Sequence, residues 1–186
     1  MSATYLIADP HFGHAAIIRM CNRPFESVEK MDEIMAESWR RTVRPNDTVI
    51  VVGDFAHRMK PDALRRLFDS LPGRKHLIIG NHDDKHTRAL GWESQHEIWH
   101  VSIDGQNVVL CHYPMLTWAK DRRGALQLYG HTHGRLRGNV QSADIGVDVM
   151  GWAPVRLSAI RDYMSTLPLR VHPEDGLENQ AGGLTP

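Results

Sequence analysis

Five short apolar runs in this chain are each followed by an Asp, an Asn or a His. This polar residue either comes directly after the run or is separated from it by one residue. The runs are Thr4–Ala8, Thr48–Val52, Lys75–Ile79, Gln106–Leu110 and Leu126–Tyr129. Their length and their content of β-branched residues are typical of buried strands. Because ligand sites of open α/β sheets lie beyond the carboxyl ends of the strands, we expect the polar residues after these runs to converge on one rim.

Two segments with the pattern of helices lie between the first three of these runs. Apolar residues recur at helical spacing over 28–42, where Ser27 is the expected N-cap. Pro61 begins a second helix, because proline fits the first helical turn. Ser158 is expected to cap a last helix that runs to about Ser165. The first part of the chain therefore alternates strand and helix.

The second part of the chain is richer in strands. Strands over 97–103 and 106–110 flank Asp104-Gly105, a strong signal for a tight hairpin, and a further strand is expected over 144–149. We expect these later strands to be mostly antiparallel. The combination predicts an α/β fold, a four-layer α/β/β/α sandwich with two mixed central sheets and a ligand site at the carboxyl-end rim.

Length and composition predict one domain and a soluble protein. The chain has 186 residues, of which 41% are hydrophobic and 24% charged. We expect a single domain over 1–166 and a poorly ordered tail over 167–186, which is rich in Pro, Gly, Glu and Asn. Cys21 and Cys111 cannot form a disulfide scaffold, and no leader or membrane-spanning run is evident, so a cytoplasmic location is expected.

Charge constrains the partners. The 22 basic and 22 acidic residues balance, which does not favour long nucleic acid as the main partner, because such binding depends on an excess of Lys and Arg. A small phosphorylated substrate is favoured instead, and no membrane partner is expected. The sequence does not indicate the oligomeric state.

The residues that follow the runs are of metal-binding types. They are Asp9, His11, Asp54, Asn81, His112, His131 and His133. Seven candidates exceed the four ligands of a typical zinc ion, so two cations that share one carboxylate fit better. Mixed nitrogen and oxygen ligands permit Mn, Fe, Zn, Co or Ni. Glycine precedes Asp54, Asn81 and His131, which suits turns that bring the backbone close to a ligand.

The blocks Asp9-x-His11, Gly53-Asp54, Gly80-Asn81-His82-Asp83, His112 and Gly130-His131-x-His133 resemble the signature of the calcineurin-like metallophosphoesterases. The HFGH and HYPM stretches resemble small bacterial and phage members. The resemblance implies a dinuclear-metal-dependent hydrolase of phosphate esters that uses a metal-activated hydroxide. It implies one metal held by Asp9, His11, Asp54 and His133, and another held by Asp54, Asn81, His112 and His131. Asp54 would be the bridge and His82 the general acid.

One departure from the family pattern concerns the group that orients His82. In the Ser/Thr-phosphatase branch a carboxylate stands three residues after the bridging Asp, where this chain has His57. This argues against a protein Ser/Thr phosphatase and leaves the partner of His82 open. Arg58, His57 and His14 are candidate substrate contacts, since a guanidinium can bind phosphate through two hydrogen bonds.

Several other residues have two readings. Asp83 is a candidate site residue or a helix cap, and Asp148 a structural residue or a support for a ligand histidine. The charged run 120–123 is a solvated surface or a substrate contact. Trp118 is a loop aromatic able to stack on a base. For Cys111 we expect a buried thiol rather than a nucleophile.

Three functions stay open at this point. A phosphomonoesterase or phosphodiesterase acting on small nucleotide-type substrates is favoured, without a choice between the two ester types. A nuclease or RNA-end-processing phosphoesterase that acts with a partner is the second, for which Arg40, Arg41 and Arg44 offer a modest basic surface. A non-catalytic scaffold on the same fold is the third.

Overall fold

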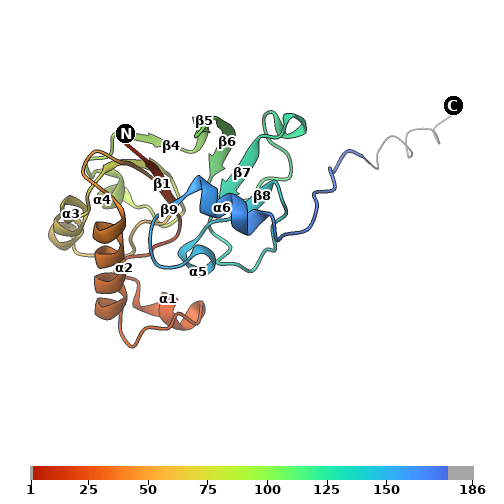
Figure 1. The fold of residues 1–186 in the computed structure, drawn as a ribbon. Helices are drawn as coiled ribbons and strands as arrows, with labels where there is room; N and C mark the ends of the chain where they lie inside the picture. The colour runs from red at the N-terminus through yellow and green to blue at the C-terminus, as the bar shows by residue number, and fades with distance from the viewer. Residues whose placement is uncertain (1, 176–186) are drawn as a thin grey trace, which may run out of the picture.

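Two sheets form the centre of the molecule, and the computed structural model describes residues 2–175 (Figure 1). The first sheet has five strands in the order β4-β3-β2-β1-β9, and β1 to β4 are parallel while β9 is antiparallel to β1. These strands are β1 (Thr4–Ile7), β2 (Thr48–Val52), β3 (Arg74–Ile78), β4 (Ser94–His96) and β9 (Val155–Arg156).

The second sheet has four strands in the order β5-β6-β7-β8. They are β5 (Ile98–Ile103), β6 (Gln106–Cys111), β7 (Leu126–Tyr129) and β8 (Ser142–Asp144). The predicted hairpin is present, with Asp104 and Gly105 both at positive φ. The expectation of mostly antiparallel strands is wrong, because β6, β7 and β8 are parallel to one another. Two mixed central sheets, as predicted, are confirmed.

The helices pack mainly on the first sheet, as Figure 1 shows. They are α1 (Ala15–Met20), α2 (Val28–Thr42), α3 (Pro61–Ser70), α4 (Lys85–Arg88), α5 (Val147–Met150) and α6 (Leu157–Met164). Side chains of α2 and α3, among them Trp39 and Phe68, form one core with the outer face of this sheet. A second core lies between the sheets, where Leu6 and Leu128 meet, and α6 closes it with Ile160. The ends of α2 match the prediction, and Ser27 accepts a hydrogen bond from the Lys30 amide.

Two predicted elements differ from the structure. The strand expected over 144–149 ends at Asp144, and residues from Val147 form α5. The chain leaves the sheet here because the Asp144 carboxylate accepts the Gly146 N–H, and the Val147 N–H donates to the carbonyl of Ala8, the residue directly after β1. The last helix begins at Leu157 without a side-chain cap, because β9 runs directly into it, so Ser158 is not its N-cap.

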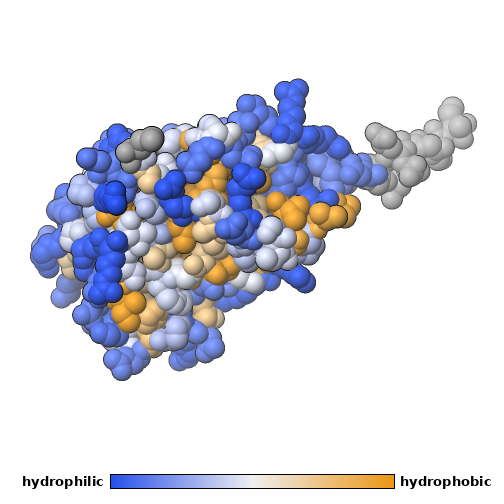
Figure 2. Space-filling view, viewed as in Figure 1, coloured by the Kyte–Doolittle hydropathy of each residue, from blue (hydrophilic) through white to orange (hydrophobic). Residues whose placement is uncertain are grey.

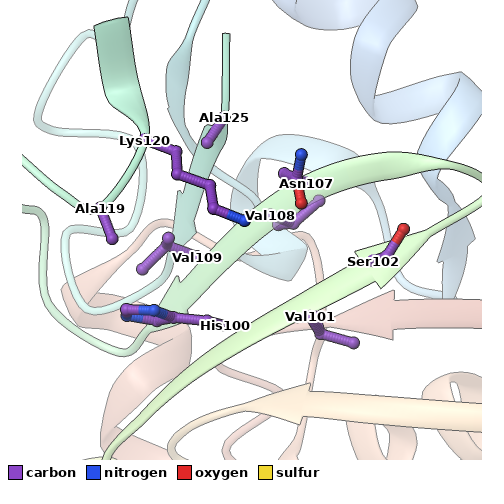
Figure 3. A pocket seen from close by; sticks show the side chains of 9 residues that line it. All are labelled: His100, Val101, Ser102, Asn107, Val108, Val109, Ala119, Lys120 and Ala125. Carbon is purple, nitrogen blue, oxygen red and sulfur yellow. The ribbon is translucent and has the colours of Figure 1, made fainter. Parts of the chain in front are cut away.

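The outer face of the second sheet is covered by a loop rather than by a long helix. This loop, residues 113–125, contains the short 3-10 helix η1 (Asp121–Arg123). Trp118 and Ala125 pack on Val109 beneath it. A hollow of about 150 Å³ lies between loop and sheet, and Figure 3 shows the Lys120 side chain extending over it toward Asn107. The loop is therefore the outer layer on this side.

The segment after α6 makes contacts that its composition did not predict. Arg170 pairs with Asp121 at 2.9 Å and lies over the Trp118 ring at 3.9 Å. Leu169 and Val171 are more than 80% exposed, and Figure 2 shows apolar atoms gathered where this segment leaves α6. The predicted tail thus contacts the 113–125 loop up to Asp175, whereas its part over 176–186 lies outside the described residues. Within residues 2–175 no helix is both long and apolar enough to cross a membrane.

Candidate metal centre

The loops after β1 and β2 run side by side beyond the sheet and place the first candidate residues together. The Asp9 N–H donates to the Gly53 carbonyl at 3.1 Å, and the His11 N–H donates to the Asp54 carbonyl at 3.0 Å. The second sheet joins at the same rim, since the His131 N–H donates to Asp9 Oδ2 at 2.8 Å. The carboxyl-end rim expected from the sequence is therefore shared by both sheets.

Glycine permits the close packing of these loops, as the sequence indicated. A Cβ on Gly53, whose φ is +86°, would lie 2.1 Å from the His112 ring. A Cβ on Gly80 would lie 2.3 Å from Asp54 Oδ1. Any larger side chain would displace a candidate ligand at either position.

The backbone of the candidate ligands is strained. Positive φ values, between 49° and 68°, are found at Asp9, His11, Asp54, His131 and His133. Such conformations cost about 1–3 kcal/mol each in residues other than glycine and cluster at functional sites. The sequence carries no sign of this strain, which arises from the need to aim several side chains at one point.

One group of ligand atoms comes from Asp9, His11 and His133, whose nearest metal-binding atoms all lie within 4.8 Å of one another. Asp54 lies beside this group, with its Oδ2 3.4 Å from His11 Nε2. Asp9 Oδ1 and His11 Nε2 are buried and have no hydrogen-bond partner among the described residues. Orphaned buried polar atoms are rare in folded proteins, and an oxygen and a nitrogen left without partners in one cluster fit the donor set of a divalent cation.

A second group lies on the other side of Asp54. His112 Nε2 is 3.5 Å from Asp54 Oδ2 and 3.1 Å from Asn81 Oδ1. Asn81 Oδ1 is also 2.9 Å from His131 Nδ1. Asp54 Oδ2 thus lies between the two groups. The structure brings together all seven residues selected from the sequence.

The pKa values of the candidate ligands are shifted because several ionisable side chains are buried close together. Burial raises the pKa of Asp9 well above its usual value, and the nearby Asp144 and Asp54 add to the rise. Burial lowers the pKa of His11 to about 2. Burial also opposes the charged forms of Asp54 and His112, but the hydrogen bond and the charge attraction between them outweigh this effect. The pKa of His112 therefore rises to about 9, and the pKa of Asp54 falls to about 2. Cations would relieve the carboxylate repulsion and compete with the proton on His112.

His133 is held by a buried network that the sequence suggested only in part. Its Nδ1 is 2.8 Å from Asp148 Oδ2, so Nε2 is left for the cluster. Arg23 donates to both oxygens of Asp148 at 2.9 Å and also to the carbonyls of Asp9 and Pro10. Asp148 therefore supports a candidate ligand, as one reading of the sequence held, and Arg23 was missed.

Two further carboxylates fix the loops that carry the candidate ligands. Asp83 accepts the N–H groups of Asp54, Phe55 and Gly80, while the cap of α4 is its neighbour Asp84. Burial raises the pKa of Asp83 to about 6. Asp144 binds the loop after β7 through Thr132 and Gly134.

Histidines form a flank beside the first group. The His82 ring meets that of His57 edge to face with centroids 4.7 Å apart, and the His14 ring is tilted against that of His57 with centroids 4.2 Å apart. Among residues 2–175 no carboxylate hydrogen-bonds to the His82 ring, so its neighbours are imidazoles. The exposed Arg58 follows His57 at a positive φ. Of the three predicted substrate contacts, His14 and His57 therefore lie beside His82, and Arg58 follows His57 in the chain.

Other loop residues have structural uses. Trp118 is 7% exposed and donates its indole N–H to the Ala125 carbonyl, which rules out base stacking by this side chain. In the charged run, Asp121 pairs with Arg170 and His172, and Arg122 pairs with Asp175. Cys111 is 8% exposed, as expected for a buried thiol.

Comparisons with known proteins identify a family that this chain matches. Residues 3–115 match the family described as calcineurin-like phosphoesterase. An uncharacterized protein of Methanocaldococcus jannaschii is 30% identical over 86% of this chain and 90% of its own length. The Gene 66 protein of Mycobacterium phage L5 is 27% identical over 95% of this chain and 99% of its own.

A similar fold is found in a solved structure, that of a protein of unknown function from Aquifex aeolicus. The TM-score is 0.69 at 22% identity, with 88% of this chain and 100% of that chain covered. At this identity the likeness concerns the fold alone.

Proposed function

This chain belongs to the calcineurin-like phosphoesterase family, whose members use divalent metals, and we propose that it hydrolyses small phosphate esters with two divalent cations. Asp9, His11, Asp54 and His133 would hold one cation. Asp54, Asn81, His112 and His131 would hold the other. A small nucleotide is the favoured substrate, and the cytoplasm is the favoured compartment because the two cysteines are both free.

The observation that carries this proposal is the pair of orphaned atoms, Asp9 Oδ1 and His11 Nε2. His11 Nε2 is 3.4 Å from Asp54 Oδ2, Asp9 and Asp54 offer ligand atoms within 4.8 Å of each other, and His112 of the second group also approaches Asp54 Oδ2. A carboxylate between two sets of nitrogen and oxygen donors is the arrangement that a pair of cations requires. The donor set fits Mn, Fe, Zn, Co or Ni.

When bound, the cations supply a hydroxide nucleophile near neutral pH and neutralise the charge of the phosphoryl oxygens. The remaining steps belong to the chain itself. His82, partly exposed at the edge of the cluster, would donate a proton to the departing alkoxide. His14, His57 and Arg58 would contact the phosphate or the leaving group from the same side. Packing among the imidazole rings, rather than a carboxylate, would orient His82.

Long nucleic acid is a weaker candidate substrate. Arg41 is paired with Glu37, and Arg40 bonds to Ser70. These arginines lie at the end of α2, which leads into the amino end of β2, whereas the candidate ligands follow the carboxyl ends. A basic surface at that place would not extend the metal centre.

The test is hydrolysis of a panel of nucleotides, cyclic nucleotides and simple mono- and diesters with Mn²⁺. His82→Ala is expected to lower kcat by about 10²–10⁴-fold, the usual contribution of a general acid. Asp54→Asn should abolish turnover and reduce the metal content. His86→Ala is the matched control, since His86 is an exposed histidine of α4 outside the cluster.

Other results would change the assignment. Unchanged hydrolysis in His82→Ala and Asp54→Asn, or no hydrolysis of any ester by the metal-loaded protein, would favour the scaffold. Rapid cleavage of DNA or RNA alone would favour the nuclease.

A further inference from the structure

A second pocket borders the metal centre on the side of β3 and β6. It measures about 340 Å³ and is lined by Ile79, Gly80, Glu97, Ile98, Cys111 and Tyr113. Gly80 directly precedes Asn81, and Tyr113 directly follows His112. The pocket is therefore continuous with two candidate ligands, and none of the flanking histidines lines it.

Two walls of this pocket are apolar and exposed. The Tyr113 side chain is 45% exposed, and its ring meets that of His131 at 4.8 Å, which holds it against the metal centre. Ile98 is 47% exposed. An exposed aromatic ring beside an aliphatic side chain suits a planar apolar ligand that stacks on one and packs against the other.

The third wall carries a carboxylate. Within residues 2–175 Glu97 is exposed and has neither a hydrogen bond nor an ion pair. Glu97 and the buried Cys111 both line the pocket, so the carboxylate is part of its wall. A carboxylate repels phosphate but accepts two parallel N–H bonds. This wall therefore suits the organic part of an ester.

We propose that this pocket binds the base of a nucleotide, and that Glu97 selects a base with two adjacent N–H donors on one edge, as guanine has. The inference rests on the proposed function, because the phosphate of the same molecule would lie at the metal centre. A volume of 340 Å³ is at the small end of the roughly 300–1,000 Å³ of ligand pockets, which suits one base and not an oligonucleotide.

Base recognition is tested first without hydrolysis, by nuclear magnetic resonance titration of the metal-free protein. Guanosine is expected to shift the amide signals of Gly80, Ile98 and Tyr113. It should bind about tenfold more tightly than inosine, which lacks the 2-amino group, because a hydrogen bond to a charged group is lost. Equal affinity for the two nucleosides, or shifts confined to other residues, would overturn the proposal.

Variants then test the two walls. Glu97→Gln is expected to remove the preference for guanosine over inosine. Tyr113→Ala is expected to weaken the binding of both nucleosides, while Tyr113→Phe should retain it. Glu93→Gln is the matched control, since Glu93 is an exposed glutamate outside the pocket. An unchanged preference in Glu97→Gln would overturn the role of the carboxylate.

Hydrolysis separates this inference from the proposed function. Whichever ester type is cleaved, kcat/KM should favour guanine over adenine nucleotides about tenfold, and Glu97→Gln should bring that ratio near one. Cleavage without base preference would contradict base recognition by the pocket and would leave the proposed phosphoesterase activity unaffected. Guanosine binding at the pocket without cleavage of any ester would support the pocket and overturn the phosphoesterase.

Discussion

Asp148 is the residue through which the fold orients His133. Its carboxylate fixes His133 Nδ1 at 2.8 Å and is itself held by Arg23. Asp148→Asn should weaken Mn²⁺ binding about 10–100-fold, the usual cost of losing a partner of a ligand histidine. Competition with a chelator measures the affinity. Asp162→Asn, an exposed aspartate of α6, is the control, and equal affinity in both variants would show that Asp148 does not act on the metal.

Arg23 is a buried cation whose loss should cost stability. Its guanidinium bonds to Asp148 and to two backbone carbonyls, with a side chain that is fully buried. Arg23→Met would leave the Asp148 charge uncompensated, which costs about 3–5 kcal/mol in the free energy of unfolding. Arg23→Lys should recover little, because an ammonium cannot reproduce the planar set of donors. Urea denaturation measures both, and full stability of Arg23→Lys would contradict the argument.

At the residue scale, the sequence identifies side chains by their place after a strand, and this sufficed for all seven candidate ligands. Arg23 lies in a loop 125 residues from its partner Asp148 and follows no strand. No local pattern could connect the two. The metal roles of the seven residues stay predictions until the ions are observed.

At the element scale, α2 depends on the cap that its sequence predicted. Ser27 Oγ accepts the Lys30 N–H at 3.2 Å and satisfies one of the free amides of the first turn. Ser27→Ala should lower the free energy of unfolding by about 1 kcal/mol. Ser27→Asp keeps an acceptor and should restore the wild-type value. Thermal and urea denaturation measure the change, and equal loss in both variants would show that the cap does not stabilise α2.

Elements with a strong local signal were predictable, and elements set by distant contacts were not. The periodicity of 28–42 and the Asp104-Gly105 turn each determine structure within a few residues. The prediction of a strand over 144–149 was wrong because the hydrogen bond from the Val147 N–H to the Ala8 carbonyl directs the chain away from the second sheet. The two-residue β9 exists only through its pairing with β1, which lies at the other end of the chain.

At the scale of the whole molecule, the C-terminal segment is tied to the loop that follows β6. Burial opposes ionisation of Asp121, but hydrogen bonds from Arg170 and others outweigh it and lower its pKa to about 2. The stability that the pair contributes is therefore present above about pH 4 and is lost as the pH falls through about 2. Arg170→Met should be less stable than wild type at neutral pH, and the difference should narrow below pH 4.

Thermal melts between pH 2 and pH 7 test this dependence. Arg161→Met is the control, because Arg161 is an exposed arginine of α6. A difference between Arg170→Met and wild type that is constant with pH would assign the effect to packing on Trp118 alone.

Metal removal acts on the molecule as a whole, because the candidate ligands come from loops of both sheets. Asp9 and Asp54 lie in the same buried group with His112, and without cations the charged form of Asp9 is disfavoured by burial and by the nearby carboxylates of Asp144 and Asp54, which raise its pKa. A ligand that binds only the folded state stabilises it by about 2.7 kcal/mol at a hundredfold excess over Kd. Treatment with a chelator should therefore lower the Tm, and Mn²⁺ should restore it.

The variant Asp54→Asn distinguishes a specific site from general ion binding. Because this variant lacks the central carboxylate of the site, the chelator should no longer change its Tm. In the control His86→Ala the full shift in Tm should persist. A chelator effect of equal size in Asp54→Asn and wild type would place the stabilising ions elsewhere on the chain.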